Sequence, residues 1–298
     1  MKKTIGIKVD VDTFRGMREG VPSLIALFDR YGVKASFFVP MGKDHTGRTV
    51  KRVLRRGFLK KAGRVGVVDT YGIRTLLYGL LLPGPEIAGK NRSLLVRIKE
   101  NGHEVGIHGL DHVFWHDNIR NLSQKRTIRE LDRAVAVYRE LLGEKPQAFA
   151  APGWNISTFA LEYLEKAGFF YTSNARGRFP FYPKLEERVF SLLEIPSTLP
   201  TLDEMVGVKG IEPAELARHF LSLLGNGLEI LTVHTELEGG KWSLFLDMFV
   251  RGALDKGYSF SRLADIAEMV EKAKSPQTAK VMFGEIEGRA GQVCLQAP

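Results

Sequence analysis

The chain has 298 residues, of which 44% are hydrophobic and 26% are charged, as in ordinary soluble globular proteins. Its 43 lysines and arginines outnumber the 34 aspartates and glutamates, and the resulting net charge of +9 favours an anionic partner. No apolar run approaches the roughly eighteen residues of a membrane-spanning helix. The single cysteine, Cys294, excludes an intramolecular disulfide, and the N-terminus lacks the apolar stretch of a signal peptide, so we expect a cytoplasmic protein.

Short apolar runs, which predict buried strands, alternate with longer amphipathic segments, which predict helices. The predicted strands are residues 5–11, 33–39, 105–107, 147–151, 169–172, 228–233 and 258–260. The predicted helices are residues 22–31, 94–101, 123–142, 157–167, 214–224, 244–255 and 261–273. This alternation predicts an α/β fold with a parallel sheet, and about seven such units suffice to close a barrel. We expect one domain over residues 1–298, with an irregular tail from about residue 275.

Residues 44–92 form an insertion much longer than the roughly two to six residues of a usual strand-to-helix loop. Cations alternate with aliphatic residues over 48–65, which predicts a basic amphipathic helix, and the apolar run 73–82 follows. Together they favour an anionic membrane surface or a lipid substrate; the alternative is a solvated basic helix beside a buried apolar one. Nucleic acid is disfavoured because the residues between the cations are mainly aliphatic rather than aromatic. The predicted lipid contacts are Arg52, Arg55, Arg56, Phe58, Leu76, Leu77, Leu80 and Leu81.

Two acids, Asp10 and Asp12, end the first predicted strand. A spacing of two residues on a strand places both carboxylates on one face. In parallel sheets the chemistry gathers at the carboxyl ends of strands, and two carboxylates are costly to bury there unless a cation or a proton shares them. This favours a functional pair over the alternative, a solvated acidic turn.

Histidines follow two other predicted strands. His108 ends one of them, and His112 lies about one turn further on, so both can reach the same ion; His234 ends the strand 228–233. Two imidazoles and a carboxylate leave open positions on a catalytic divalent metal, although a pair of structural histidines would show the same spacing. We predict that Asp12, His108 and His112 hold the metal, that Asp10 is the general base and that His234 is the general acid. The turn after the fourth strand, with Gly153 and Trp154, offers a backbone N–H to the oxyanion.

These motifs resemble the polysaccharide deacetylase (NodB-homology) family. Val9-Asp-Val-Asp12 is similar to its first motif, His108 to His112 to its second, and Leu231-Thr-Val-His234 to its last. The resemblance implies an irregular seven-stranded (β/α) barrel and metal-dependent removal of acyl groups from sugars, with the roles assigned above. Ala150 departs from the family, which usually has an arginine there that orients the base.

A closer resemblance explains that departure. The segments 10–22, 173–177, 195–201 and 234–239 are similar to a branch of the family that deformylates an undecaprenyl-phosphate-linked formamido-arabinose during lipid A modification, and this branch also lacks the arginine. The branch implies a lipid-linked sugar substrate at a membrane, and we expect a peripheral protein on the cytoplasmic face of the inner membrane. From the ligand types we expect one divalent ion, Zn, Mn or Co, and we expect no nucleic acid or obligate protein partner.

Three further residues are candidates for substrate contacts. Arg176 is predicted to meet the substrate phosphate or to form a surface salt bridge, and Glu236 and Glu238 to contact the sugar or to hold their loop. The alternative functions are a deacetylase of another acylated glycan, a haloacid-dehalogenase-type phosphatase with Asp10 as nucleophile, and a non-catalytic membrane-surface protein. The phosphatase would leave His108, His112 and His234 without a role.

Overall fold

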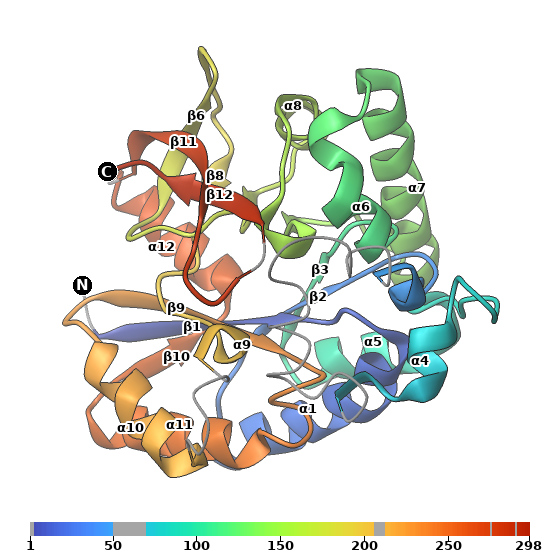
Figure 1. Cartoon of the computed structure of the whole chain (residues 1–298). Helices are drawn as coiled ribbons and strands as arrows, with labels where there is room; N and C mark the ends of the chain where they lie inside the picture. The colour runs from blue at the N-terminus through green and yellow to red at the C-terminus, as the bar shows by residue number, and fades with distance from the viewer. Residues whose placement is uncertain (1–2, 50–69, 206–211, 275, 290) are drawn as a thin grey trace.

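The computed structural model describes residues 3–49, 70–205, 212–274, 276–289 and 291–298 (Figure 1). Within these residues seven strands pair in parallel, in the spatial order β9–β1–β2–β3–β4–β5–β8. Their bounds are β1 Thr4–Asp10, β2 Ser36–Val39, β3 Glu104–Ile107, β4 Ala148–Phe149, β5 Tyr171–Thr172, β8 Leu193–Glu194 and β9 Leu228–His234. Of these seven strands, β4, β5 and β8 have only two residues each, so the sheet is irregular.

The two edge strands of this curled sheet are joined by hydrogen bonds just beyond β8. The N–H groups of Thr198 and Leu199 donate to the carbonyl of Ile230 on β9 at 3.1 and 3.2 Å. The hydroxyls of Ser197 and Thr232 are 2.6 Å apart beside them. The predicted irregular seven-stranded (β/α) barrel is therefore confirmed.

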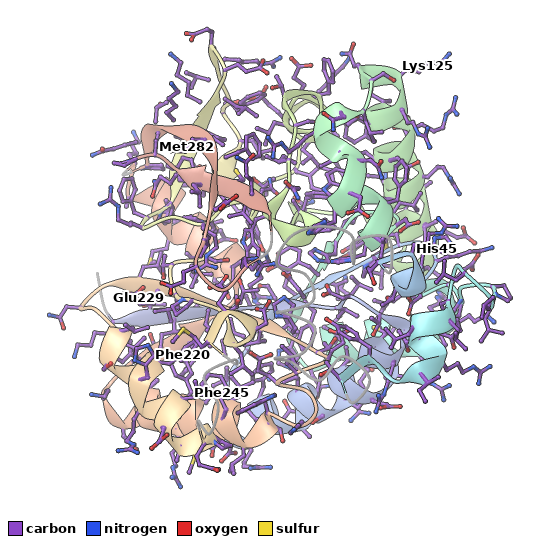
Figure 2. All side chains as sticks on the ribbon, in the orientation of Figure 1. His45, Lys125, Phe220, Glu229, Phe245 and Met282 are labelled. Carbon is purple, nitrogen blue, oxygen red and sulfur yellow. The ribbon has the colours of Figure 1, made fainter. Side chains whose placement is uncertain are left out.

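Helices pack their apolar faces against the sheet, most of them on the outside of the barrel. The longer ones are α1 Val21–Tyr31, α5 Arg92–Glu100, α7 Gln124–Leu142, α8 Thr158–Lys166, α10 Pro213–Leu223, α11 Ser243–Asp255 and α12 Leu263–Lys272. The shorter ones are α4 Ile73–Leu77, α6 His112–Asn118 and α9 Leu202–Met205. Phe220 of α10 and Phe245 of α11 meet edge to face with ring centroids 5.0 Å apart (Figure 2).

Alternate residues of β1 face opposite sides of the sheet, as the strand period of two requires. Ile5, Ile7 and Val9 belong to the large apolar cluster under the outer helices. On the other face, a Cβ added to Gly6 would lie 2.7 Å from Ile266 of α12, so α12 packs closely against this end of the strand. Lys8 and Asp10 follow Gly6 on the same face and are both buried, at 0% and 4% exposed.

The structure corrects the expectation of an irregular tail. β11 Gln277–Glu285 and β12 Gln292–Gln296 form an antiparallel hairpin, and β11 extends the sheet by pairing in parallel with β6 Phe181–Leu185. β7 Arg188–Val189 pairs with β6, and β10 Ser259–Ser261 pairs with β1. Most of β11 is exposed, so its sequence lacks the apolar alternation of a half-buried strand. Cys294 on β12 is buried, and burial raises the pKa of its thiol well above the usual value.

The insertion is described only in part. The basic segment predicted to be helical lies mostly outside the described residues, and so do Arg52, Arg55, Arg56 and Phe58. The apolar run 73–82 forms the short α4 and a tight turn rather than one continuous helix. No helix in the described part of the chain is long and apolar enough to span a membrane.

Candidate active site

Asp10 and His234 lie side by side at the carboxyl ends of neighbouring strands. β1 and β9 are parallel, and Asp10 and His234 are paired in their register. The N–H of Thr235 donates to the carbonyl of Asp10 at 3.1 Å, which continues the ladder one residue past the strands. Asp12 follows two residues after Asp10, so all three side chains are carried by the same rim of the barrel.

The two histidines come from β3 and from the helix after it. His108 directly follows β3, and its Nδ1 lies 2.8 Å from the carbonyl of Ala150. Because a carbonyl oxygen can only accept, Nδ1 carries the proton and donates it in this hydrogen bond, which leaves Nε2 free to bind a ligand. His112 is the first residue of α6, whose N-cap Asp111 accepts a hydrogen bond from the N–H of Phe114 at 2.9 Å. Asp111 also lies 2.6 Å from Nδ1 of His45, which braces the cap from the insertion side.

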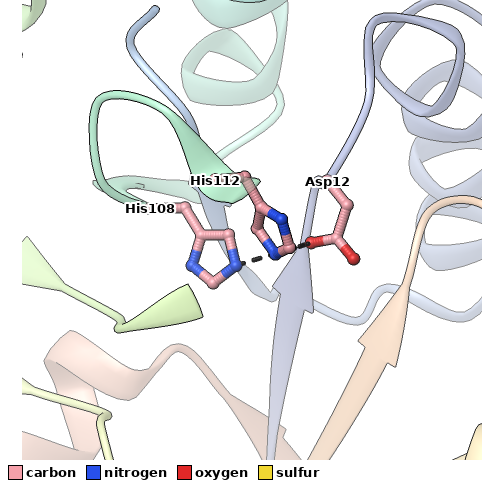
Figure 3. A group of neighbouring side chains, drawn as sticks. All are labelled: Asp12, His108 and His112. Carbon is pink, nitrogen blue, oxygen red and sulfur yellow. Dashed lines mark ion pairs between the residues drawn. The ribbon is translucent and has the colours of Figure 1, made fainter. Parts of the chain in front are cut away.

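Asp12, His108 and His112 converge on one point (Figure 3). Oδ1 of Asp12 lies 3.1 Å from Nε2 of His112 and 3.5 Å from Nε2 of His108, and the ligand atoms of all three lie within 4.8 Å of one another. Burial raises the pKa of the Asp12 carboxyl, but the charge of His112 and the hydrogen bonds from both histidines outweigh it and hold that pKa well below its usual value. An anionic oxygen and two imidazole nitrogens at this spacing suit a divalent cation of the zinc type.

The carboxylate of Asp10 is held on one side only. Its Oδ2 lies 3.1 Å from Nζ of Lys8, whereas its Oδ1 is buried without a hydrogen-bond partner among the described residues. Nδ1 of His234 is likewise buried without a partner in that part of the chain. The backbone N–H of His234 donates to Oε2 of Glu238 at 2.9 Å. The rim thus carries two side chains with an unsatisfied polar atom, Oδ1 of Asp10 and Nδ1 of His234.

Glu236 and Glu238 support the loops that carry the site. Oε1 of Glu236 accepts hydrogen bonds from the N–H of Thr13 at 2.9 Å, from the Thr13 hydroxyl at 2.7 Å and from the N–H of Asp12 at 3.2 Å. A Cβ on Gly16 would lie 2.0 Å from that oxygen, so the close approach requires glycine. Burial, and then the charge of Asp12, raise the pKa of Glu236 to about 8. Glu238 is 0% exposed, so of the two predicted roles the geometry favours holding the loop.

The turn at Gly153 and Trp154 has a strained backbone, and the N–H groups of Trp154 already have hydrogen-bond acceptors within the protein. Both residues have positive φ, 62° and 52°, and a Cβ on Gly153 would lie 2.0 Å from the ring of His116. The N–H of Trp154 already donates to the carbonyl of Ala151 at 3.1 Å, which argues against its predicted role as an oxyanion donor; for Gly153 that role stays a prediction. The indole N–H of Trp154 donates to the Ser197 hydroxyl at 3.2 Å.

The guanidinium group of Arg176 is mostly buried and binds other residues of the protein. Its Nη1 lies 2.5 Å from Oε1 of Glu204, its Nη2 donates to the carbonyl of Leu199 at 2.9 Å, and its side chain is 11% exposed. Its guanidinium also lies 5.3 Å from the ring of Trp154, and that of Arg289 lies 4.4 Å from the same ring. Of the two predicted roles the ion pair is the one formed here, buried rather than at the surface, and the phosphate contact has no geometric support.

Comparison with known proteins assigns this chain to a family. Residues 1–172 match the model of the polysaccharide deacetylase family, and the chain belongs to that family. It is therefore a hydrolase of amide bonds, and the phosphatase and non-catalytic alternatives are set aside.

Two curated relatives match nearly the whole chain. The probable 4-deoxy-4-formamido-L-arabinose-phosphoundecaprenol deformylase ArnD of Shewanella sediminis (strain HAW-EB3) is 33% identical over 294 residues, which are 98% of this chain and 94% of the relative. The protein of the same name from Wigglesworthia glossinidia brevipalpis is 29% identical and covers 94% of this chain and 98% of its own length.

Solved structures agree on the fold. A crystal structure from Mycobacterium smegmatis, described as a polysaccharide deacetylase, superposes with a TM-score of 0.64 at 21% identity and covers 96% of both chains. The Puue allantoinase superposes with a TM-score of 0.62 at 15% identity and covers 92% of this chain and 91% of its own. At these identities the likeness concerns the fold alone.

The sequence did not identify Lys8 as part of the site. A lysine inside an apolar strand was one signal available, because burying an ammonium group is costly unless a partner compensates its charge. Lys8 also shares the strand face of Asp10 and Asp12, since all three are spaced by two residues. The contribution of His45 to the cap of α6 could not be predicted, because it depends on how the insertion folds back.

Proposed function

We propose that this protein is a metal-dependent deformylase that removes the formyl group from undecaprenyl-phosphate-linked 4-deoxy-4-formamido-L-arabinose and releases formate in lipid A modification. The observation that carries the proposal is the convergence of Asp12, His108 and His112 beside Asp10 and His234 at one rim. The names of the two full-length relatives supply the substrate. An acetamido sugar or another acylated glycan is the second candidate, since the same residues would serve it.

Asp12, His108 and His112 are the residues that would hold a zinc, manganese or cobalt ion. Such an ion supplies Lewis acidity, which polarises a bound carbonyl and lowers the pKa of a water molecule. The free Oδ1 of Asp10 accepts the proton of the attacking water, and His234 gives a proton to the leaving amine. The low pKa of Asp12 keeps it anionic as a ligand, which separates its task from that of Asp10.

An exposed apolar patch supports a lipid-linked substrate. We call residues Ile73, Leu80, Leu81 and Leu82 the α4 patch; they are 68%, 45%, 80% and 36% exposed. Leu76 and Leu77, also predicted lipid contacts, are half-buried beneath it. The neighbouring Arg74 is exposed, and the Arg48 side chain is 43% exposed, which suits anionic lipid head groups.

The turn that carries the α4 patch is linked to the residue before His112 through a chain of contacts. The N–H of Gly47 donates to the carbonyl of Tyr78 at 3.0 Å, and a Cβ on Gly79 would lie 2.8 Å from the His45 ring. His45 in turn lies 2.6 Å from Asp111, the residue before His112. This linkage supports a substrate whose lipid contacts the patch while its sugar reaches the rim that carries the metal-binding residues.

Replacing Leu80 and Leu81 together with serine is expected to weaken binding to anionic phospholipid vesicles by at least about tenfold, because apolar area buried in the interface is lost. Vesicle sedimentation at low salt measures it. Leu244→Ser on α11, where Leu244 is 54% exposed, is the matched control. If the double variant binds as well as the control, the patch is not the membrane contact.

The substrate assignment is tested by incubating the metal-loaded protein with the formamido-arabinose lipid and with its acetamido analogue, and by measuring released formate and acetate. We expect formate release to exceed acetate release, because both relatives that match nearly the whole chain are named as deformylases. Acetate release at an equal or higher rate would instead support the second candidate, and release of neither acid would contradict both.

A further inference from the structure

We propose that Lys8 is a positioning residue: its ammonium group clamps Oδ2 of Asp10 and thereby turns Oδ1 toward the reacting water. The inference rests on the proposed function in one respect, namely that Asp10 is the general base. It concerns a residue of β1 that no motif described above includes.

Lys8 is held in one place by several partners at once. Its Nζ lies 3.1 Å from Oδ2 of Asp10 and donates to the carbonyl of Ser173 at 3.3 Å. The same nitrogen lies 4.9 Å from the centre of the Trp154 ring, on the strained turn. The side chain is 0% exposed, so bulk water does not compete with these contacts. An ammonium group that is buried and held by three contacts can fix the position of the carboxylate that it pairs with.

The acids near Lys8 identify Asp10 as the one it holds. Glu194 is also buried nearby, and the charge of Lys8 partly offsets the rise that burial causes in the pKa of Glu194. However, the Glu194 carboxylate is already satisfied by the Thr172 hydroxyl at 2.6 Å and by the N–H groups of Asn174 and Ala175 at 2.6 and 2.8 Å. Among the described residues no N–H or hydroxyl group donates to the Asp10 carboxylate, and its ion pair with Lys8 is the contact that orients it.

The two carboxylate oxygens of Asp10 have different surroundings and therefore different tasks. The clamped Oδ2 cannot rotate away without breaking the pair, and Oδ1 is left without a partner in the described part of the chain. The spacing of two along β1 makes both side chains emerge on the same face, so the clamp is built into a single strand. Ala150, small and apolar, brings no cation to this carboxylate.

The test compares kcat, KM, bound metal and melting temperature for Lys8→Met with those for the wild type. We expect kcat for formate release to fall about 100-fold, because a displaced base loses its near-attack geometry. KM and metal content should be unchanged, since none of the contacts of Lys8 in the described part of the chain is with Asp12, His108 or His112, and its side chain is buried. Lys8→Arg, which keeps the cation, should recover most of the activity. Lys34→Met, at a partly exposed surface ion pair with Asp29, is the matched control.

A double variant keeps the inference falsifiable if Lys8→Met alone folds poorly. Lys8→Met combined with Asp10→Asn removes both charges of the ion pair together, and its kcat should equal that of Asp10→Asn alone, because Lys8 acts through Asp10. A further loss in the double variant, or a wild-type kcat in Lys8→Met, would overturn the inference.

The role of Lys8 can also be tested if the proposed function is wrong. If the wild type releases no formate, the crystal structure of Lys8→Met decides the matter without an assay. An Asp10 carboxylate rotated away from its wild-type position supports the clamp, and an unmoved carboxylate overturns it.

Discussion

Replacing His112 with alanine is expected to abolish both metal binding and amide hydrolysis. The variant keeps two of the three converging ligands, and two ligands hold a divalent ion too weakly to polarise a carbonyl. We expect bound metal to fall well below one equivalent and kcat/KM to drop by about 1,000-fold or more, because several kcal/mol of transition-state stabilisation depend on the ion. Metal analysis after gel filtration, together with the formate assay, measures both effects.

The control for this variant is His219→Ala. His219 lies on the exposed face of α10 and contacts the ring of Phe220, so its loss removes an imidazole without touching the rim. If His112→Ala retained one equivalent of metal and the activity of this control, the triad would not be the metal site.

Replacing Asp10 with asparagine is expected to separate proton transfer from metal binding. The amide keeps the shape of the carboxylate but cannot accept the proton of the attacking water at neutral pH. A positioned base typically contributes about 100- to 10,000-fold, so we expect kcat to fall within that range. Metal content should stay at the wild-type level, because the converging ligand atoms belong to Asp12, His108 and His112.

Asp29→Asn provides the matched control for this variant, since Asp29 is partly exposed in a pair with Lys34. An Asp10→Asn protein with wild-type kcat would remove Asp10 from the reaction. A protein that lost its metal as well would make Asp10 a ligand instead of a base.

The site was predictable from the sequence because parallel strands bring distant residues to one rim. Asp10, His108 and His234 each come at the end of an apolar run. A parallel sheet brings the carboxyl ends of these strands to the same rim, although the three residues are far apart in the chain. His112 was predicted from its spacing alone, but its exact placement depends on the Asp111 cap, which puts it at the start of α6.

Other features could not be predicted because they depend on tertiary contacts. β11 is mostly exposed, and its pairing with β6 is a long-range contact that no local pattern indicates. Arg176 looked available for a phosphate, yet α9 supplies Glu204 to pair with it. Trp154 looked like a source of an N–H group, but the left-handed turn directs that group to Ala151. Sequence position indicates which residues can reach the rim, but not which of their polar groups are already satisfied.

The central claim, that Asp12, His108 and His112 form the metal centre of an amide hydrolase, is tested most directly by the metal dependence of formate release. The protein is stripped with a chelator, and formate release from the formamido-arabinose lipid is measured while zinc, manganese or cobalt is added back. We predict no release from the stripped protein and full release at one equivalent of one of these ions. Undiminished release from protein shown to be free of metal would contradict the account.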